Sequence, residues 1–395
     1  MKIIIIALTG SYIDDDIEEA FSEMGDVCIR MDLSVLHAVE KKYDNLPLER
    51  ELDRRIEAGP DLCVFTTNFH PVVARVCHRK GIVYLAWQND TPPNLPTEDE
   101  MDHPTNRIFF FNKTDCDFYR NKGLEHIYYL PMAVNTKRLS DLSKMNGTVG
   151  AYRTEVSLVG QLYMSTLPVL KGWMSPYEKG WIEGLIAAQN QVYSDFFIEE
   201  LLTPEFMETL NADFAQKQEG LSVNKRQLSF SIATYLTYLD RITLLSVLSQ
   251  RFQTDLYTDK IGDAERSVLG KTRIHGPVDY KTQMPLVFKA SKINLCPVLR
   301  NNTNAIPLRA VDVMGSGGFL MTNFHMGMAE AFEDGKEFVM YHCVEEAVDL
   351  AGYYLEHEEK RRKITENGFA KMEKEYRYRD RILALKKSVE DSWAV

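Results

Sequence analysis

The segment from Ile293 to Asn323 constrains the fold most, because its hydrophobic pattern changes three times within a short stretch. An apolar run, Ile293 to Val298, is typical of a buried strand. A polar loop follows, and then a helix is predicted that begins between Thr303 and Pro307 and ends at Gly315. The apolar residues 319–322 predict a second strand. Strand, helix and strand in this order indicate an α/β sheet with a ligand-binding loop.

The loop at residues 301–304 has the properties of an anion site. A helix N-terminus presents unpaired backbone N–H groups and a partial positive charge, which suits a phosphate or diphosphate. Arg309 lies in the first turn, where a cation costs roughly 0.3–1 kcal/mol against the helix dipole and a bound anion would reverse that cost. The alternative is an ordinary ion pair with Asp312, three residues later. The glycine-rich stretch 315–318 would let strand and helix pack closely beside a cleft.

The rest of the chain continues the alternation of strands and helices. A chain of 395 residues suggests more than one domain, and the pattern starts again near Glu155. We therefore predict an N-terminal Rossmann-like domain at 1–150 and a second one at 151–376. A helical insertion at about 167–249 interrupts the second domain, and a C-terminal helix at 377–395 follows it.

The composition excludes several classes of protein. The net charge is −11, which argues against a groove for nucleic acid or an anchor on an anionic membrane. The apolar start, Ile3 to Leu8, is too short for a signal sequence or a transmembrane segment, and it predicts a buried strand. Six cysteines without any CxxC spacing argue against disulfides and zinc, so we expect a cytoplasmic protein.

Several stretches together resemble one enzyme family. They are KASKINLCPVLRNNTNAIPLRAVDVMGSGGFLMTNF from Lys289, YLAWQNDTPP from Tyr84 and VSLVGQLY from Val156. The chain resembles the glycosyltransferases that include the spore maturation protein CgeB. The resemblance implies the GT-B architecture, in which two Rossmann-like domains face each other and a C-terminal helix crosses back to the first. It also implies a nucleotide-sugar donor in the C-terminal half, no cofactor and no bound metal.

The family's donor motif, two glutamates eight residues apart, falls on Asn304 and Asp312, and both differ from it. Asp312 keeps a carboxylate that could take two ribose hydroxyls. Asn304 cannot be an anion, although it can hydrogen-bond a sugar hydroxyl or cap the helix. Arg309 matches the family's arginine before the acidic position, and Gly160 matches the glycine that ends the first strand of the donor domain.

The diphosphate is expected at loop 301–304 with Arg300 and Arg309, and also at Lys260, because no DxD-like pair stands at a strand end. The alternatives are solvated charges for Arg300 and Lys260, a core position for Tyr280 and a plain tight turn at Gly160. The predicted donor-binding residues are Gly160, Gln161, Tyr163, Lys260, Val278, Tyr280, Arg300, Asn301, Asn302, Thr303, Asn304, Arg309 and Asp312.

An inverting transfer needs a general base in the N-terminal domain, whereas a retaining one does not. His70 and Asp90 are the two candidates, because both follow predicted strands. A structural role is the alternative for each, and Asp90 also precedes a turn-forming Thr-Pro-Pro sequence. The acidic run Asp14 to Asp16 is better explained by the start of a helix, where acids stabilise the dipole.

The sequence therefore predicts a metal-independent glycosyltransferase that moves a sugar from a nucleotide-diphosphate sugar, by default a UDP-sugar. The acceptor is a hydroxyl on a glycan, a protein or a lipid. One alternative is a nucleotide-sugar epimerase of the same architecture. The other is a non-catalytic nucleotide-sugar-binding or scaffold protein, because Asn304 and Asp312 depart from the usual glutamates.

Overall fold

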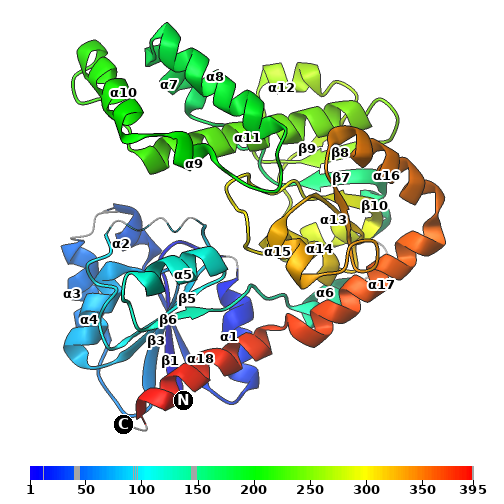
Figure 1. The fold of residues 1–395 in the computed structure, drawn as a ribbon. Helices are drawn as coiled ribbons and strands as arrows, with labels where there is room; N and C mark the ends of the chain where they lie inside the picture. The colour runs from blue at the N-terminus through cyan, green and yellow to red at the C-terminus, as the bar shows by residue number, and fades with distance from the viewer. Residues whose placement is uncertain are drawn as a thin grey trace. The chain divides into compact units, whose positions relative to one another are not determined.

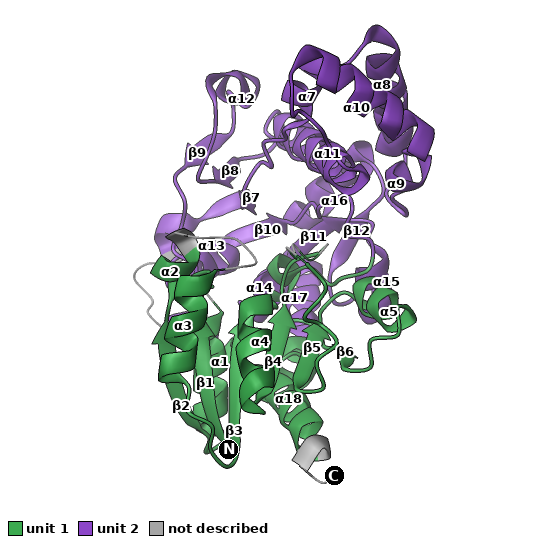
Figure 2. Ribbon diagram, turned by 90° about the vertical axis from the view of Figure 1, so that its left-hand side faces the viewer, with its two compact units in different colours: residues 1–138, 304–311, 370–395 green, residues 139–303, 312–369 purple. Residues whose placement is uncertain are grey.

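The computed structural model describes residues 1–11, 13–39, 45–91, 93, 95, 97–143 and 149–393. It forms two compact units (Figures 1 and 2), and each is described by itself. Unit 1 comprises residues 1–138, 304–311 and 370–395, and unit 2 comprises 139–303 and 312–369. The domain boundaries expected near 150 and 376 stay predictions, and residues 144–148 beside the first lie outside the described residues.

Unit 1 is built on a six-stranded parallel sheet with the order β2-β1-β3-β4-β5-β6. Its inner strands β3 and β4 are buried along their whole length, because helices cover both faces of such a sheet. The strands are β1 (Lys2–Ala7), β2 (Val27–Asp32), β3 (Leu62–Thr67), β4 (Val83–Gln88), β5 (Asn106–Phe110) and β6 (Ile127–Tyr129).

The helices of unit 1 include the last helix of the chain. Ile382, Leu385 and Val389 of α18 lie in one buried cluster with residues of α1 and the sheet, and the Tyr378 ring meets Trp87 edge-on. The prediction that the C-terminal helix packs on the first sheet is therefore confirmed. The helices are α1 (Asp14–Glu23), α2 (Ser34–Val39), α3 (Leu46–Arg55), α4 (Pro71–Lys80), α5 (Lys113–Asn121) and α18 (Tyr378–Trp393), and α6 (Thr136–Ser143) leads into the range of unit 2.

Unit 2 has a second six-stranded parallel sheet with the order β12-β11-β10-β7-β8-β9. β7 and β10 are neighbours at the centre of the sheet. The strands β8 and β9 follow on the side of β7, and β11 and β12 follow on the side of β10, so the topological switch point lies between β7 and β10. The strands are β7 (Thr154–Val159), β8 (Thr254–Tyr257), β9 (Arg273–His275), β10 (Ser291–Leu295), β11 (Leu320–Asn323) and β12 (Val339–Tyr341).

The predicted helical insertion is present in unit 2 between β7 and β8. Its helices bury a core of their own, which includes Ile182, Leu210 and Phe214. The insertion consists of α7 (Leu167–Trp173), α8 (Pro176–Asn190), α9 (Ile198–Leu201), α10 (Pro204–Lys217) and α11 (Lys225–Leu248). The other helices are η1 (Val149–Tyr152), α12 (Asp263–Val268), α13 (Met284–Ala290), α14 (Leu308–Gly315), α15 (Met326–Ala331), α16 (Val344–Glu356) and α17 (Glu358–Glu375).

The helix predicted to begin between Thr303 and Pro307 begins later than expected. α14 starts at Leu308, because Ala305 and Ile306 are buried in an irregular segment and the Pro307 carbonyl accepts the first helical hydrogen bonds from Ala310 and Val311. Arg309 still falls in the first turn, as predicted.

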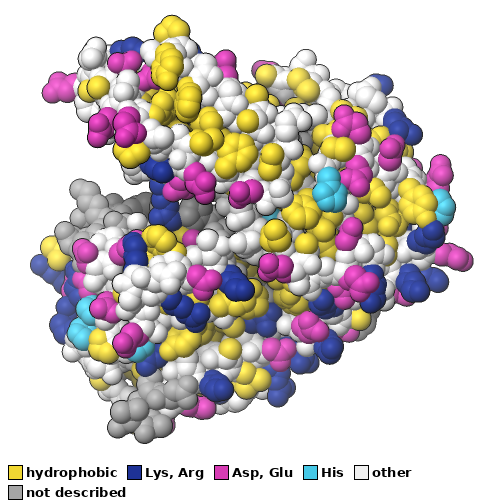
Figure 3. Space-filling model, viewed as in Figure 1, with side chains coloured by type: hydrophobic (Ala, Val, Ile, Leu, Met, Phe, Trp, Pro, Cys, Tyr) yellow, Lys and Arg dark blue, Asp and Glu magenta, His cyan; other side chains and the backbone are white. Residues whose placement is uncertain are grey.

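No helix in the part of the chain that the structure describes is long and apolar enough to cross a membrane. On the face shown in Figure 3, acidic and basic side chains are interspersed over the surface.

Candidate functional site

The loop after β7 turns sharply at the switch point of the unit 2 sheet. Gly160 has φ 148° and Tyr163 has φ 59°, so two of the loop's residues use positive φ. A Cβ atom on Gly160 would lie 3.4 Å from Nη1 of Arg241. A side chain at this position would be strained by its φ, whereas its contact with the arginine would be an ordinary van der Waals contact. The sequence alone left open whether Gly160 serves a ligand or only a turn, and the positive φ is a reason for glycine.

Arg241 of α11 connects the carboxyl ends of the two central strands. Its Nη1 atom donates to the carbonyl of Gln161 after β7, and its Nη2 atom donates to the carbonyl of Pro297 after β10 at 2.6 Å. The guanidinium carbon lies 4.6 Å from the centre of the Tyr163 ring. Arg241 thereby brings Gln161 and Tyr163 together with the loop that follows β10.

The charge of Arg241 is buried and has no counter-ion among the described residues. The residue is 9% exposed, and its Nε atom is buried without a hydrogen-bond partner. None of the acids in the described ranges lies within salt-bridge distance of it. A buried cation without an anion is costly, so this position favours a negatively charged ligand. The sequence analysis missed Arg241, because it lies within a long helical pattern 80 residues from Gln161.

Arg300, a predicted diphosphate ligand, uses its guanidinium inside unit 2. Its Nε and Nη2 atoms donate to Asp240 at 2.6 and 2.8 Å, and Nη1 donates to the Val192 carbonyl at 2.8 Å. The guanidinium carbon lies 3.7 Å from the centre of the Tyr193 ring. The structure therefore gives Arg300 a role in holding the loop after β10 on α11, which its backbone bond to Thr237 reinforces.

The polar loop 301–304 is fixed by His325. The His325 Nδ1 atom accepts from the Met328 amide, so the proton is on Nε2, which donates to the Asn302 carbonyl at 2.7 Å. Burial lowers the pKa of His325 to about 4, and the ring is therefore neutral near pH 7. The Asn301 Oδ1 atom is buried without a partner, and Thr303 is half-buried.

Asp312 and Tyr280, which were predicted separately, meet in unit 2. The Tyr280 hydroxyl donates to Oδ1 of Asp312 at 2.9 Å, and Asp312 is only 4% exposed. Val278 is half-buried, and Lys260 is exposed after β8. Within the described ranges, no hydrogen bond or ion pair joins the Lys260 side chain to the other predicted residues.

Asn304 and Arg309 belong to the segment 304–311 of unit 1. The Asn304 amide donates to the Thr114 hydroxyl at 2.9 Å, and the neighbouring Ala305 lies in a buried core cluster of this unit. Arg309 is half-buried in the first turn of α14.

In unit 1, Asp90 is positioned by a residue that the sequence analysis missed. Asn68 follows β3 with φ 63°, donates to Oδ2 of Asp90 at 2.9 Å and accepts from the Asn89 amide at 2.8 Å. Asn is one of the few residue types that tolerate this φ, which is the signal that could have identified it. Partial desolvation raises the pKa of Asp90, and the bond from Asn68 opposes that rise.

His70, the other candidate base, is the N-cap residue immediately before α4. Burial lowers the pKa of His70 to about 4, and the neighbouring His37 adds to the effect. The Nε2 atom of His70 is buried without a partner. A base with so low a pKa is weak at pH 7.

The three acids at the start of α1 form a hydrogen bond and salt bridges with neighbouring side chains. Asp14 accepts from the Thr67 hydroxyl at 2.5 Å, Asp15 pairs with Arg30, and Asp16 pairs with Arg138 at 2.9 Å. Within the described ranges, no group of three or more His, Cys, Asp or Glu residues is arranged to hold a metal ion.

Comparison with known proteins gives one family match over part of the chain and several solved structures of similar fold. Residues 241–387 match the family model described as glycosyl transferase-like. The chain is similar in structure to the Anabaena protein HepE in complex with UDP-glucose, with a TM-score of 0.56, 10% identity and 100% of both chains covered. No curated protein matches the sequence significantly.

Two further solved structures share the fold. The sucrose-phosphate synthase of Thermosynechococcus elongatus has a TM-score of 0.57 at 10% identity, with 100% of this chain and 99% of that chain covered. The trehalose 6-phosphate synthase of Burkholderia multivorans has a TM-score of 0.53 at 11% identity, with 99% of both chains covered. These findings confirm the predicted fold and class of enzyme: the chain has the GT-B fold, and its residues 241–387 match a glycosyl transferase-like family.

Proposed function

We propose that the protein transfers a sugar from a nucleotide-diphosphate sugar to an acceptor hydroxyl and that unit 2 holds the donor at the ends of β7 and β10. The observation that carries this proposal is Arg241, a buried cation at the switch point of the sheet that forms no salt bridge with any described acid. Ligands of open α/β sheets bind outside the carboxyl ends of the strands at this point. A diphosphate there would supply the missing negative charge.

The residues around Arg241 suit the parts of such a donor. Arg241 would neutralise the diphosphate as it leaves. Asp312 would accept hydrogen bonds from ribose hydroxyls, and Tyr280 would fix its carboxylate. Fixed protein cations would take the place of a metal ion in this mechanism.

A UDP-sugar is the proposed donor. The Anabaena neighbour was solved with UDP-glucose, and a similar trehalose-phosphate synthase from Burkholderia vietnamiensis is described as UDP-forming. These neighbours are 10% and 12% identical to this chain, so the base and the sugar need a direct test. The acceptor is proposed to be a hydroxyl of a glycan, a protein or a lipid. A cytoplasmic location is proposed from the cysteine pattern of the sequence, which has no CxxC spacing.

Asp90 is the proposed general base if the transfer inverts configuration. Its raised pKa brings it closer to neutral pH, whereas the lowered pKa of His70 makes that ring a weaker base. Asp90 is also exposed, and Asn68 holds its carboxylate in place.

Calorimetry of the full chain with UDP-, GDP-, CMP- and dTDP-sugars, each with and without EDTA, tests the proposal. We expect one nucleotide class to bind and EDTA to leave its affinity unchanged. Nucleotide release on addition of glycan, peptide or lipid hydroxyls would then identify the acceptor.

Each alternative gives a different result in these measurements. The absence of affinity for every nucleotide would indicate a non-catalytic protein. Formation of an epimer from donor alone, followed by NMR, would indicate an epimerase. Loss of donor binding in EDTA would refute metal independence.

A further inference from the structure

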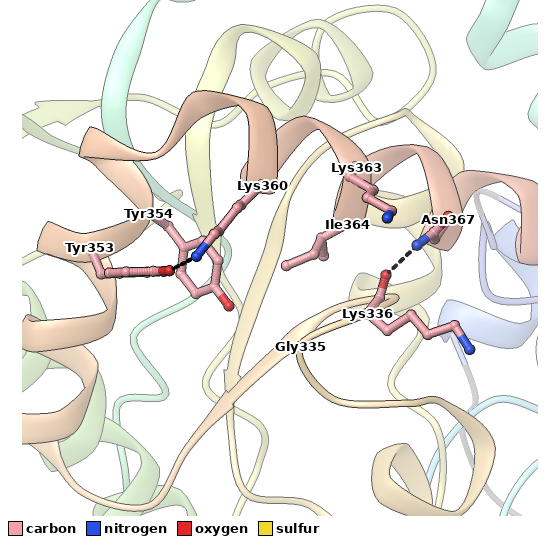
Figure 4. A pocket seen from close by; sticks show the side chains of 8 residues that line it. All are labelled: Gly335, Lys336, Tyr353, Tyr354, Lys360, Lys363, Ile364 and Asn367. Atoms are coloured by element: carbon pink, nitrogen blue, oxygen red, sulfur yellow. Dashed lines mark hydrogen bonds between the residues drawn. The ribbon is translucent and has the colours of Figure 1, made fainter.

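A cavity lies in unit 2 where α16 and α17 meet, beside the loop that precedes β12. Its volume is about 370 Å³, within the roughly 300–1,000 Å³ of small-molecule sites. Figure 4 shows side chains of α16 and α17 on one side of it and the loop at Gly335 and Lys336 on the other. The lining residues are Gly335, Lys336, Tyr353, Tyr354, Lys360, Lys363, Ile364 and Asn367.

The lining is basic, although the chain as a whole has a net charge of −11. Three of the eight residues are lysines and none is acidic. Lys360 and Lys363 lie three residues apart on α17, where like charges repel each other. Neither pairs with a carboxylate of any residue that the structure describes. An anion between them would remove this repulsion.

The acids of the loop beside the cavity are bound by other groups. Glu333 pairs with Lys336 at 2.7 Å, and both side chains are more than half exposed. Asp334 accepts from the Met340 amide at 2.8 Å, and Glu337 accepts from the Glu333 amide at 2.9 Å. None of these three carboxylates forms a salt bridge with Lys360 or Lys363.

Tyr354 adds a hydrogen-bond donor to the cavity. The residue is 9% exposed, and no described residue hydrogen-bonds its hydroxyl. Figure 4 shows the hydroxyl on the cavity side of the ring. The Tyr353 hydroxyl, by contrast, is bound by Lys360, and the Asn367 amide donates to the Lys336 carbonyl at 2.9 Å.

The cavity is separate from the site around Arg241. Gly335 and Lys336 precede β12, and Tyr353 and Tyr354 lie near the end of the helix that runs back from it, so the cavity lies at the amino edge of the sheet. Arg241 binds loops at the carboxyl edge. A ligand in one site therefore does not compete directly with a ligand in the other.

We propose that this cavity binds a small phosphate monoester. Lys360 and Lys363 would neutralise the phosphate as point charges, and the Tyr354 hydroxyl would donate to it. Ile364 would contact the organic part of the ligand, for which the cavity has room beyond a single phosphate group. A sugar phosphate and a nucleoside monophosphate share this chemistry.

Calorimetry of the full chain with inorganic phosphate, glucose 6-phosphate and AMP tests the proposal. At least one ester is expected to bind with a Kd below about 1 mM and more tightly than inorganic phosphate. The ester that binds more tightly shows whether the ligand is a sugar phosphate or a nucleoside monophosphate. The double variant Lys360→Ala/Lys363→Ala should weaken its binding by about tenfold or more, and Tyr354→Phe should weaken it less.

The matched control is Arg362→Ala on the same helix, since Arg362 is exposed and pairs with Glu366 outside the cavity lining. Arg362→Ala should leave ester affinity unchanged, and an unchanged melting curve will show that each variant is folded. Equal ester affinity in the double variant and the wild type, or no ester binding at all, would overturn the proposal. The variant Arg241→Lys should still bind the ester, because Arg241 does not line this cavity. Loss of UDP binding in that variant would therefore bear on the proposed transferase function and not on the ester site.

Discussion

The Nη2 atom of Arg241 lies 2.6 Å from the carbonyl oxygen of Pro297, and the same guanidinium donates to the Gln161 carbonyl from Nη1. One side chain thus binds the two loops that flank the switch point. Because carbonyl oxygens take up only part of its hydrogen-bonding capacity and none of its charge, Arg241 both shapes the site and leaves it positive.

Replacing Arg241 with lysine should separate these two roles. A lysine keeps the charge, but its ammonium cannot reach both carbonyls in the fixed geometry of a guanidinium. We expect UDP to bind at least about tenfold more weakly to Arg241→Lys, measured by calorimetry, which corresponds to about 1.4 kcal/mol. Arg251→Lys, an exposed position soon after the same helix, is the control and should bind UDP like the wild type. Equal UDP affinity in both variants would remove Arg241 from the donor site.

The variant Asp312→Asn tests the proposed ribose contact. Asparagine keeps the shape of the side chain but loses the charge that favours two hydroxyl donors. We expect UDP affinity to fall by about tenfold, while Tyr280→Phe, which removes only the 2.9 Å hydrogen bond to Asp312, should cause a smaller loss. If Asp312→Asn binds UDP as well as the wild type does, the carboxylate serves the fold alone.

The ion pair of Arg300 and Asp240 should be important for stability. Their side chains are 3% and 9% exposed, so removal of one partner leaves a buried charge. Arg300→Met is expected to lower the free energy of unfolding in urea by about 3–5 kcal/mol. The double variant Asp240→Asn/Arg300→Met should lose less than the sum of the two single variants. Additive losses would show that the two side chains do not act as a pair.

Local patterns in the sequence were enough to predict the sheets and the helical insertion. The run Lys2–Ala7 is apolar over most of its length, Thr154–Val159 is apolar at alternate positions and at its end, and the insertion has helical periodicity over a long stretch. Arg309 was correctly placed in the first turn of α14, although that helix begins later than predicted because Ala305 and Ile306 pack in irregular conformation.

The contacts that define the site could not be predicted in this way, because they join residues far apart in the chain. Arg241 is 80 residues from Gln161, and Arg300 is 60 residues from Asp240. Sequence reasoning treats a charged side chain as solvated by default, whether in a loop like Arg300 or in a helix like Arg241. It therefore could not show that Arg300 is buried against Asp240 and that Arg241 is buried without an acid among the described residues. Only the fold decides which arginine meets an aspartate.

Buried histidines should make the protein less stable in mild acid. The pKa of His325 is lowered to about 4 by burial, while an unfolded chain protonates histidine near 6.5. The stability that neutral His325 contributes is therefore complete above about pH 6.5 and is lost as the pH falls toward 4. For His325 this amounts to about 2 kcal/mol between pH 6.5 and 5. Urea unfolding should show a smaller loss over this range in His325→Gln, whereas His342→Gln, at an exposed position, should match the wild type.

Asp90→Asn tests the general base. If the transfer is inverting, the loss of the carboxylate should lower kcat by about 10²–10⁴-fold without changing UDP affinity. Asn68→Ala, which removes the 2.9 Å hydrogen bond to Asp90, should lower kcat by a smaller factor, because the base is then present but less well positioned. His70→Asn is the comparison, since a ring whose pKa lies near 4 is a weak base at pH 7. A large loss of kcat in His70→Asn with normal turnover in Asp90→Asn would transfer the role to His70, and normal turnover in both would indicate a transfer that needs neither side chain as base.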